Sequence, residues 1–378
     1  MTVKIIHTAD WQIGKQFGFI AQDAGAIARV QRLKTVEEIA KLALERRVDA
    51  VIVAGDVFEN NTLADDTLRK TVQAMRYFKD GKWILLPGNH DPASAESAWT
   101  RLERIGIPEN IVVATSEEPI FLGERGLAVL PAPLHRKHEV RDLTESFGSR
   151  KTSDGVIRVG LAHGSVENVL SGEWDAKNPI ATDRTSLARL DYLALGDWHG
   201  TLRVNDRTWY AGTPEPDSFK ENDTGNVLLV TFENPGAIPQ VEKISVGHFV
   251  WHTFDNPLHG ADDISHLARE FGSLQEPHDR HIVQVRLSGV LDLVSRSALD
   301  RALAEWAAKF HFLSVSEENL LTEPTEDDFD RIDLSGFVRT AVERLREIQK
   351  NASHPEHEYA EDALRRLYFE QVSGETKP

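Results

Sequence analysis

Short apolar segments alternate with longer amphipathic ones over residues 1–115, and this alternation constrains the fold more than any other feature of the chain. The strand-like segments are VKIIHT, DAVIVAG, WILLPG and NIVVA. Between them, helical spacing of apolar residues predicts helices at about 24–47, 65–79 and 94–105. Strands that alternate with helices in this way predict βαβ units and a mostly parallel sheet.

The following segments are rich in strands. They are GLAVLPA, GVIRVGLAH, DYLALGD, RTWYAG, GNVLLVTFE and GHFVWHTF. Turns with Gly, Asn or Asp separate several of them. We therefore expect a second sheet packed on the first.

The pattern changes near Asn256 and Pro257, where a small α/β unit is predicted, with a helix at about 261–272. An acidic linker, TEPTEDDFD, and two amphipathic helices follow. Their apolar stripes are Leu334, Phe337, Val338, Ala341, Leu345 and Ile348 in one helix and Ala363, Leu364, Leu367 and Tyr368 in the other. Two interpretations stay open, because such stripes either pack on the body of the protein or dock a partner.

Composition excludes several classes of site. The 378 residues include no cysteine, which removes disulfides, thiolate metal sites and cysteine nucleophiles. Neither a signal peptide nor a run of ~18 apolar residues is found, so we expect a cytoplasmic protein that does not insert into a membrane. The net charge of −17 repels polyanions at long range. A nucleic-acid substrate would therefore need local attraction, for which bound metal cations are the obvious source.

Five stretches place polar, metal-capable residues directly after a strand-like segment. They are TADWQ (Asp10, Gln12), AGDVFE (Asp56), PGNHD (Asn89, His90, Asp91), LAHG (His163) and LGDWHG (Asp197, His199). Each alone is explained by a turn, a helix cap or a core histidine. Because ligands gather beyond the carboxyl ends of strands in α/β sheets, the five together predict one cleft. Carboxylates, an amide oxygen and imidazoles can hold two divalent cations there.

The order of these motifs resembles that of the binuclear metallophosphoesterase superfamily. Within it, HTADWQIGK, AGDVFENN and PGNHDP resemble the SbcD-like DNA repair nucleases. The segment LGDWHG…WYAGTPEPDSF is similar to a bacterial branch of manganese-dependent phosphodiesterases and DNA endonucleases. The resemblance implies an α/β (α+β) fold in which a two-sheet β-sandwich is flanked by helices. Its implied domains are a catalytic domain (1–254), a small α/β capping domain (255–322), and an acidic linker with C-terminal helices (323–378).

The resemblance also implies a set of metal ligands. One cation would be held by Asp10, the residue at 12, Asp56 and His199, and the other by Asp56, Asn89, His163 and the residue at 197. Two positions depart from the commonest pattern, in which both are His, because this chain has Gln12 and Asp197. Each change replaces nitrogen by oxygen, which favours manganese or magnesium over zinc. We expect two divalent cations, with Mn²⁺ as the best activator and Mg²⁺ as the next.

The implied reaction is in-line hydrolysis of a phosphodiester by a hydroxide that bridges the two metals. His90 would act on the phosphate or leaving oxygen, and Asp91 would orient it. Weaker signals for contact with DNA are the basic cluster PLHRKH, with Arg136 and Lys137, and the tryptophans Trp11 and Trp198 beside the predicted ligands. The simpler interpretation of the basic cluster is a solvated loop, and that of the two tryptophans is core packing.

Three functions remain open from the sequence. The first is a nuclease acting on single-stranded or structured DNA in repair. Its possible partners are an ATPase or another repair protein, docked on the C-terminal helices, or a second copy of the chain. The second is a phosphodiesterase of small, for example cyclic, nucleotides. The third is an inactive scaffold that binds a partner, for which Gln12 and Asp197 are the only support.

Overall fold

The computed structural model describes most of the chain in detail. The described residues are 2–20, 22–123, 126–169, 177–220, 222–322, 337–351, 353–357, 359–360, 363–364 and 366–367. Contacts divide the chain into two units, the first made of Met1–Trp251 with Arg280–Ile282 and the second of His252–Asp279 with Val283–Pro378. In the described residues, no helix is long and apolar enough to cross a membrane.

Two six-stranded sheets form the centre of the first unit. The first sheet has the spatial order β14 (Gln240–Ser245), β13 (Asn226–Phe232), β1 (Val3–Thr8), β2 (Ala50–Val53), β3 (Lys82–Leu85), β4 (Ile111–Val113). The second has the order β11 (Leu202–Arg203), β12 (Thr208–Tyr210), β10 (Tyr192–Gly196), β7 (Ile157–His163), β6 (Leu127–Ala132), β5 (Ile120–Leu122). Strands β1 to β4 are parallel, and so are β6, β7, β10 and β12. The predicted two-sheet α/β fold is therefore confirmed, and the second sheet is also largely parallel.

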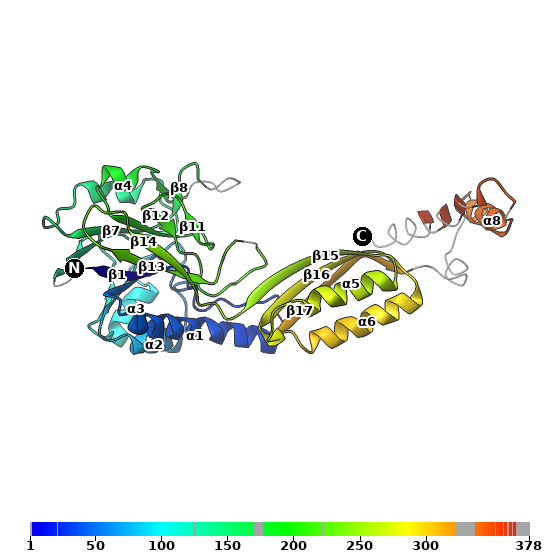
Figure 1. Ribbon diagram of the computed structural model, residues 1–378, viewed down its shortest axis with the longest axis horizontal. Helices are drawn as coiled ribbons and strands as arrows, with labels where there is room; N and C mark the ends of the chain where they lie inside the picture. The colour runs from blue at the N-terminus through cyan, green and yellow to red at the C-terminus, as the bar shows by residue number, and fades with distance from the viewer. Residues whose placement is uncertain are drawn as a thin grey trace. The chain divides into compact units, whose positions relative to one another are not determined.

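Helices cover the outer face of the first sheet (Figure 1). They are α1 (Gln22–Arg46), α2 (Asp65–Ala74) and α3 (Ala98–Ile105), close to the predicted ranges. Helix α3 begins where Ser97 accepts a hydrogen bond from the backbone N–H of Thr100 and ends at Gly106, whose φ is 91°. Shorter elements complete this unit: η1 (Met75–Tyr77), η3 (Leu143–Gly148), β8 (Ser165–Val166), β9 (Pro179–Ile180) and α4 (Arg184–Leu187).

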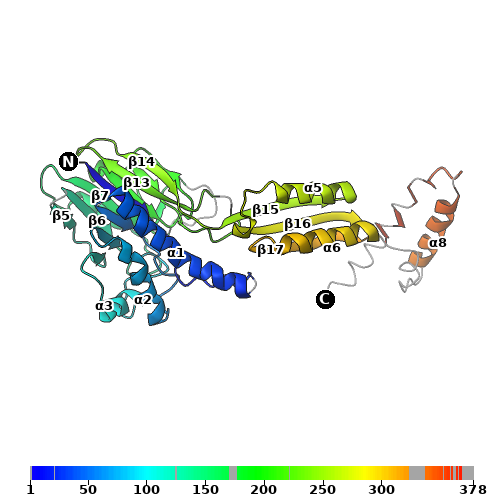
Figure 2. The same cartoon turned by 60° about the horizontal axis from the view of Figure 1, so that its bottom comes forward.

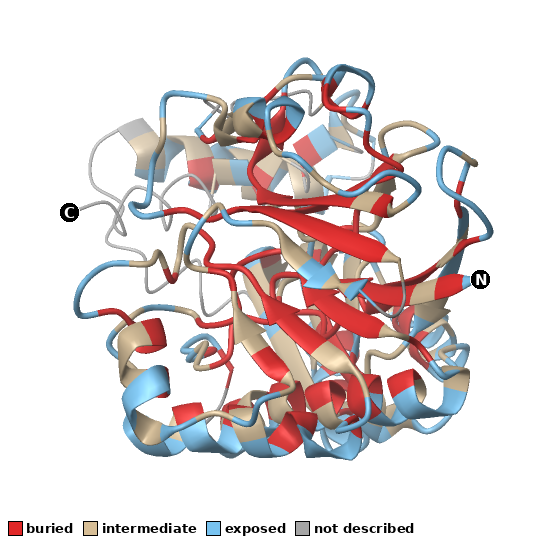
Figure 3. Ribbon diagram, turned by 90° about the vertical axis from the view of Figure 1, so that its left-hand side faces the viewer, coloured by how far each residue is buried: buried red, intermediate tan, exposed pale blue. Residues whose placement is uncertain are grey.

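The hydrophobic core follows the alternation of side chains along each strand. In β1, Ile6 packs against the helices, whereas Ile5 faces the second sheet. Figure 3 shows the central strands of both sheets as buried and the outward faces of the helices as exposed. The two sheets thus share one apolar layer, and this layer fixes how their strand ends lie relative to each other.

The second unit contains a three-stranded sheet of β15 (Val250–Leu258), β16 (His281–Leu291) and β17 (Phe312–Thr322). Helices α5 (Ala261–Gly272) and α6 (Leu293–Ala307) lie along one face of this sheet (Figure 2). A short helix, η4 (His278–Arg280), precedes β16. The helix predicted at about 261–272 is α5.

The C-terminal part is described only in pieces. The predicted acidic linker from Glu323 onward, Leu334 and Tyr368 lie outside the described residues. Helix α8 (Phe337–Lys350) carries part of the first predicted stripe. Its Val342, together with Val338 and Leu345 of that stripe, packs in one cluster with Leu364 and Leu367 of the second stripe. The two stripes therefore contact each other.

A buried polar contact joins the two sheets. The Nε2–H of His7 on β1 donates to the carbonyl oxygen of Leu195 on β10 at 3.1 Å. Its Nδ1 therefore accepts from the hydroxyl of Tyr192 at 3.0 Å. Burial lowers the pKa of His7 to about 3, so the ring is neutral in the folded protein.

We predict that Tyr192→Phe destabilises the protein by about 1–3 kcal/mol, because the buried Nδ1 of His7 loses its donor. The free energy of unfolding from urea titrations measures this loss. Tyr77→Phe, at a tyrosine that is 38% exposed, is the control and should change stability by less than about 0.5 kcal/mol. Equal stability of the two variants would mean that the His7 contact contributes nothing.

Candidate metal centre

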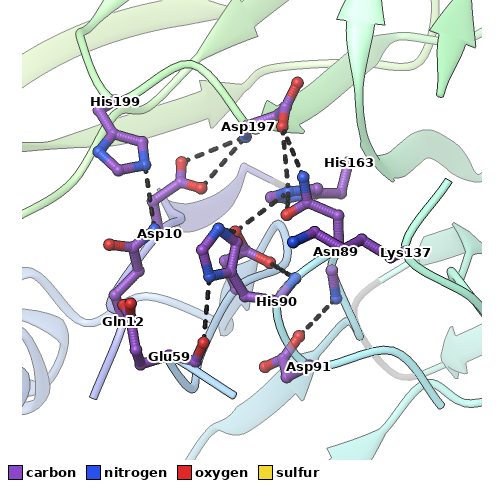
Figure 4. Close-up of polar contacts among 12 residues, drawn as sticks. Asp10, Gln12, Glu59, Asn89, His90, Asp91, Lys137, His163, Asp197 and His199 are labelled. Atoms are coloured by element: carbon purple, nitrogen blue, oxygen red, sulfur yellow. Dashed lines mark hydrogen bonds and ion pairs between the residues drawn. The ribbon is translucent and has the colours of Figure 1, made fainter. Parts of the chain in front are cut away.

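The five predicted stretches converge at one edge of the two sheets. Asp10 and Gln12 follow β1, Asp56 follows β2, and Asn89 follows β3. His163 is the last residue of β7, and Asp197 and His199 follow β10. A cleft of about 320 Å³ opens there, lined by residues from both sheets, and Figure 4 shows the converging side chains. Parallel strands present their carboxyl ends at a shared edge, which explains why residues so distant in sequence meet.

Four of the predicted ligands have left-handed backbone conformations. The φ angles are 52° for Asp10, 41° for Gln12, 51° for Asp56 and 99° for Asp197. Non-glycine residues rarely adopt positive φ, and such residues gather at functional sites. Four of the predicted ligands thus share a backbone conformation that non-glycine residues seldom adopt.

Asp10, Asp56 and His163 form the centre of the site. One ligand atom from each lies within 4.8 Å of the others, as a bound metal ion requires. The Nε2 of His163 lies 3.5 Å from Oδ2 of Asp56 and 3.6 Å from Oδ1 of Asp197. It also lies 3.3 Å from Oδ1 of Asn89, whose Nδ2 donates to Asp197 at 3.2 Å. Nε2 of His163 therefore lies within 3.6 Å of an oxygen from each of the other three predicted ligands of the second cation.

Burial makes the charged forms of the carboxylates in this cluster unfavourable. It raises the pKa of Asp10 to about 7, and the negative charges of Asp56 and Asp197 act in the same direction. Burial alone would lower the pKa of His163, but the charge of Asp56 and a hydrogen bond to it raise that pKa well above its usual value. A bound divalent cation would relieve the repulsion among the carboxylates, and the oxygen and imidazole donors suit such an ion. The residues present therefore fit a metal site.

Three histidines of the site are held in the same way. Each binds an oxygen through Nδ1, namely the carbonyl of Ala54 for His163 (2.8 Å), the carbonyl of Glu59 for His90 (3.1 Å) and the carboxylate of Asp217 for His199 (3.4 Å). With Nδ1 engaged, Nε2 is the nitrogen available to the site. Such partners of a histidine fix its tautomer and orientation in metal sites.

Gln12 lies beside His199 rather than in the central cluster. Its Nε2 is 3.1 Å from Nε2 of His199, and its Oε1 accepts from Nζ of Lys15 at 3.0 Å. Lys15 also donates to Asp217 at 2.6 Å. Lys15 and Asp217 were not predicted as site residues, although Asp217 belongs to the segment WYAGTPEPDSF that carries part of the resemblance.

Comparison with known proteins identifies a family for part of the chain. Residues 3–179 match the family described as calcineurin-like phosphoesterase. These matched residues, just under half of the chain, belong to a calcineurin-like metallophosphoesterase domain. The match ends before Asp197 and His199, so the place of these two residues in the site comes from the structure.

Similar proteins include DNA repair proteins and components of a nuclease. The DNA double-strand break repair protein Mre11 of Methanosarcina acetivorans is 22% identical over 259 residues, which are 66% of this chain and 40% of that protein. The SbcD subunit of the nuclease SbcCD from Escherichia coli K12 is 24% identical over 281 residues, 65% of this chain and 68% of the relative. Its counterpart of the same name from Bacillus subtilis is 21% identical over 413 residues and covers 98% of both chains. The chain thus spans less than half of the archaeal relative and nearly all of the Bacillus one.

In this metallophosphoesterase domain, His90 and Asp91 have different surroundings from those predicted. His90 lines the cleft, and its Nε2 lies 4.0 Å from Oδ2 of Asp56. The Asp91 carboxylate instead accepts the backbone N–H groups of Phe58 (2.9 Å) and Gly88 (2.7 Å). The prediction that Asp91 orients His90 is therefore wrong, because its oxygens hold the loop backbone and the Glu59 carbonyl holds the imidazole. Burial raises the pKa of Asp91 to about 8, with a further contribution from the charge of Asp56.

The residues predicted to contact DNA differ in their positions. Trp11 is 1% exposed and donates from Nε1 to Thr8 Oγ1 at 2.9 Å, so it is a core residue with no face for a base. Trp198 lines the cleft. The exposed Arg136 pairs with Glu139 at 2.9 Å, whereas the side chain of Lys137 points toward Asn89 (Figure 4). Trp198 therefore faces the cleft and Lys137 a predicted ligand that lines it, whereas Trp11 belongs to the core.

Arg32 is a further residue that the sequence analysis missed. It is 2% exposed and donates to the carbonyl oxygens of Asp10, Trp11 and Glu215. Arg32 thereby joins the first ligand loop to the loop that carries Asp217. A signal was present, because Arg32 lies one helical turn before Val36 on the apolar stripe of α1, where a charged residue is unexpected.

We predict that Gly88→Ala weakens cation binding by about 10–100-fold, the effect typical of disturbing the groups around metal ligands. A Cβ at position 88 would lie 2.2 Å from Oδ1 and 2.4 Å from the backbone nitrogen of Asp56, so Asp56 must move. Calorimetric titration with Mn²⁺ measures the change. Gly123→Ala is the control, because nothing lies within 4 Å of a Cβ there. Unchanged Mn²⁺ affinity in the Gly88 variant would argue against Asp56 as a ligand.

Proposed function

We propose that this chain is a metal-dependent nuclease that hydrolyses phosphodiesters of single-stranded or structured DNA in repair. The observation that carries the proposal is the buried cluster of Asp10, Asp56 and His163, whose Asp56 lines the cleft together with His90. The similarity to proteins named as parts of a nuclease and as DNA repair proteins supports DNA as the substrate. The assembled donor set weighs against an inactive scaffold.

The residues would hold two divalent cations, with Asp56 shared. One position consists of Asp10, Gln12, Asp56 and His199, and the other of Asp56, Asn89, His163 and Asp197. When bound, the cations would neutralise the phosphate and lower the pKa of an attacking water. The oxygen donors Gln12 and Asp197 favour Mn²⁺, and Mg²⁺ next.

The protein's own residues bind and orient the phosphodiester. Lys15 and Lys220 line the cleft, and Lys137 points toward it, so positive charge is local despite the net charge of −17. His90 in its imidazolium form donates Nδ1–H to the carbonyl of Glu59 and offers Nε2–H to the cleft. The leaving oxygen takes this proton as its bond to phosphorus breaks.

A partner that docks on the C-terminal helices is part of this proposal. The relatives from E. coli and B. subtilis are named as subunits, which supports an assembly with a further protein such as an ATPase. Since Val342 of α8 and Leu364 pack together, a partner would use the remaining surface of these segments. A homodimer is the alternative assembly.

A parallel assay tests the proposed activity. We expect Mn²⁺ to support cleavage of single-stranded DNA and of a bis-aryl phosphodiester, with less activity in Mg²⁺ and least in Zn²⁺. Duplex DNA is the third substrate. Turnover of the small ester without any DNA cleavage would favour a phosphodiesterase of small nucleotides, which the cleft volume of about 320 Å³ also accommodates. No turnover with any of these metals would favour the scaffold.

We predict that His90→Ala lowers kcat by about 10²–10⁴-fold, the usual contribution of a general acid, and leaves Mn²⁺ affinity unchanged. Rate assays and calorimetry on the same variant separate the two effects. His266→Ala, at a histidine whose side chain is 61% exposed, is the control. Loss of Mn²⁺ binding by the His90 variant would make His90 a metal ligand instead.

A further inference from the structure

Four side chains at the edge of the metal centre form a closed ring of three hydrogen bonds and one ion-pair contact, which we call the Lys15 ring. Lys15 Nζ contacts Gln12 Oε1 (3.0 Å), and Gln12 Nε2 contacts His199 Nε2 (3.1 Å). His199 Nδ1 contacts Asp217 Oδ2 (3.4 Å), which accepts from Lys15 at 2.6 Å. Lys15 and Asp217 are not among the proposed metal ligands.

Hydrogen-bond donors and acceptors fix the direction of every contact in the ring. The ammonium of Lys15 has only donors, so Gln12 must turn its carbonyl oxygen toward Lys15 and its NH₂ group toward His199. Nε2 of His199 must then accept, which leaves the proton on Nδ1 for Asp217. A proton on Nε2 would set two donors against each other, so the ring is complete only with a neutral imidazole.

This tautomer is the one that a metal ligand at Nε2 requires. Asp217 is 2% exposed, and no other carboxylate in the described residues is recorded within ion-pair distance of His199. Asp217 can therefore orient His199, because its Oδ2 lies 3.4 Å from Nδ1 of that ring.

Lys15, unlike Asp217, opposes the binding of a cation. It holds Oε1 of Gln12, the only atom through which Gln12 can ligate a metal, and it turns the NH₂ group of Gln12 toward Nε2 of His199. A cation that binds both residues must displace this arrangement. The ammonium also adds a positive charge next to two of the proposed ligands.

We propose that the Lys15 ring sets the cation affinity of the half of the site formed by Asp10, Gln12 and His199. Asp217 is a positioning residue that raises this affinity by presenting Nε2 of His199, and Lys15 lowers it by occupying Gln12. The inference rests on the proposed two-cation function. It assigns the ion near His199 as the weaker and more exchangeable of the two.

Opposite changes in Mn²⁺ affinity test the proposal. Lys15→Met should tighten the weaker of two binding steps several-fold, because Gln12 is released and a repelling charge is lost. Asp217→Asn should weaken the same step about 10–100-fold, since an amide can turn its NH₂ group toward Nδ1 and select the other tautomer. Calorimetry and the electron paramagnetic resonance signal of free Mn²⁺ measure both steps without substrate.

Conservative and remote variants separate this role from a structural one. Lys15→Arg keeps the charge and should bind Mn²⁺ as the wild type does, and Asp217→Glu should restore part of the affinity. The exposed pair Lys243 and Asp223, with Nζ and Oδ2 2.8 Å apart, supplies the controls Lys243→Met and Asp223→Asn.

Three results would overturn the proposal. Weaker binding in both ring variants would make the ring a structural support only. Unchanged binding in both would remove its role altogether, while two-step binding by the wild type would leave the proposed function standing. Absence of Mn²⁺ binding by the wild-type protein would overturn the proposed function and the ring together.

Discussion

The mutual repulsion of Asp10, Asp56 and Asp197 is the constraint on which the rest of the site depends. Like charges at close range in a buried setting are unfavourable unless a cation or a proton compensates them. Burial, and to a smaller extent the charges of Asp56 and Asp197, raise the pKa of Asp10 to about 7. Contacts with His163 and His90 hold the pKa of Asp56 below its usual value against the effect of burial. The surrounding structure forces the carboxylates together, which is what a protein must do to bind divalent cations tightly.

The backbone supplies that force. Left-handed conformations at Asp10, Asp56 and Asp197 aim the carboxylates inward, and glycines at 55 and 88 leave room for His163 and Asp56. Arg32 adds a buried cation that fastens the carbonyl groups of the first loop to the loop of Asp217. None of these groups reaches a substrate, yet each fixes where a ligand lies.

Much of this arrangement could be predicted from the sequence. The alternation of strands and helices predicts the sheets, and parallel strands bring Asp10, Asp56, Asn89, His163 and His199 to one edge. The contacts of Asp91 could not be predicted, because its partners are backbone N–H groups that any residue carries. Asp217 and Lys15 are 202 positions apart, and only the packed sheets bring them together. Trp11 shows the converse limit, since a tryptophan next to a ligand is equally compatible with a core position and with a stacking platform.

The candidate ligands belong to both sheets, and this gives the site a mechanical character. Asp10, Asp56 and Asn89 follow strands of the first sheet, and His163, Asp197 and His199 belong to the second. A cation bound by ligands from both sheets would link the two sheets at this edge of the apolar layer. A small sliding of one sheet over the other would separate its ligands before it exposed any of the core. The affinity for a metal would therefore depend on the spacing of the two sheets. The apolar side chains packed between the sheets set this spacing, so they support metal coordination as well as stability.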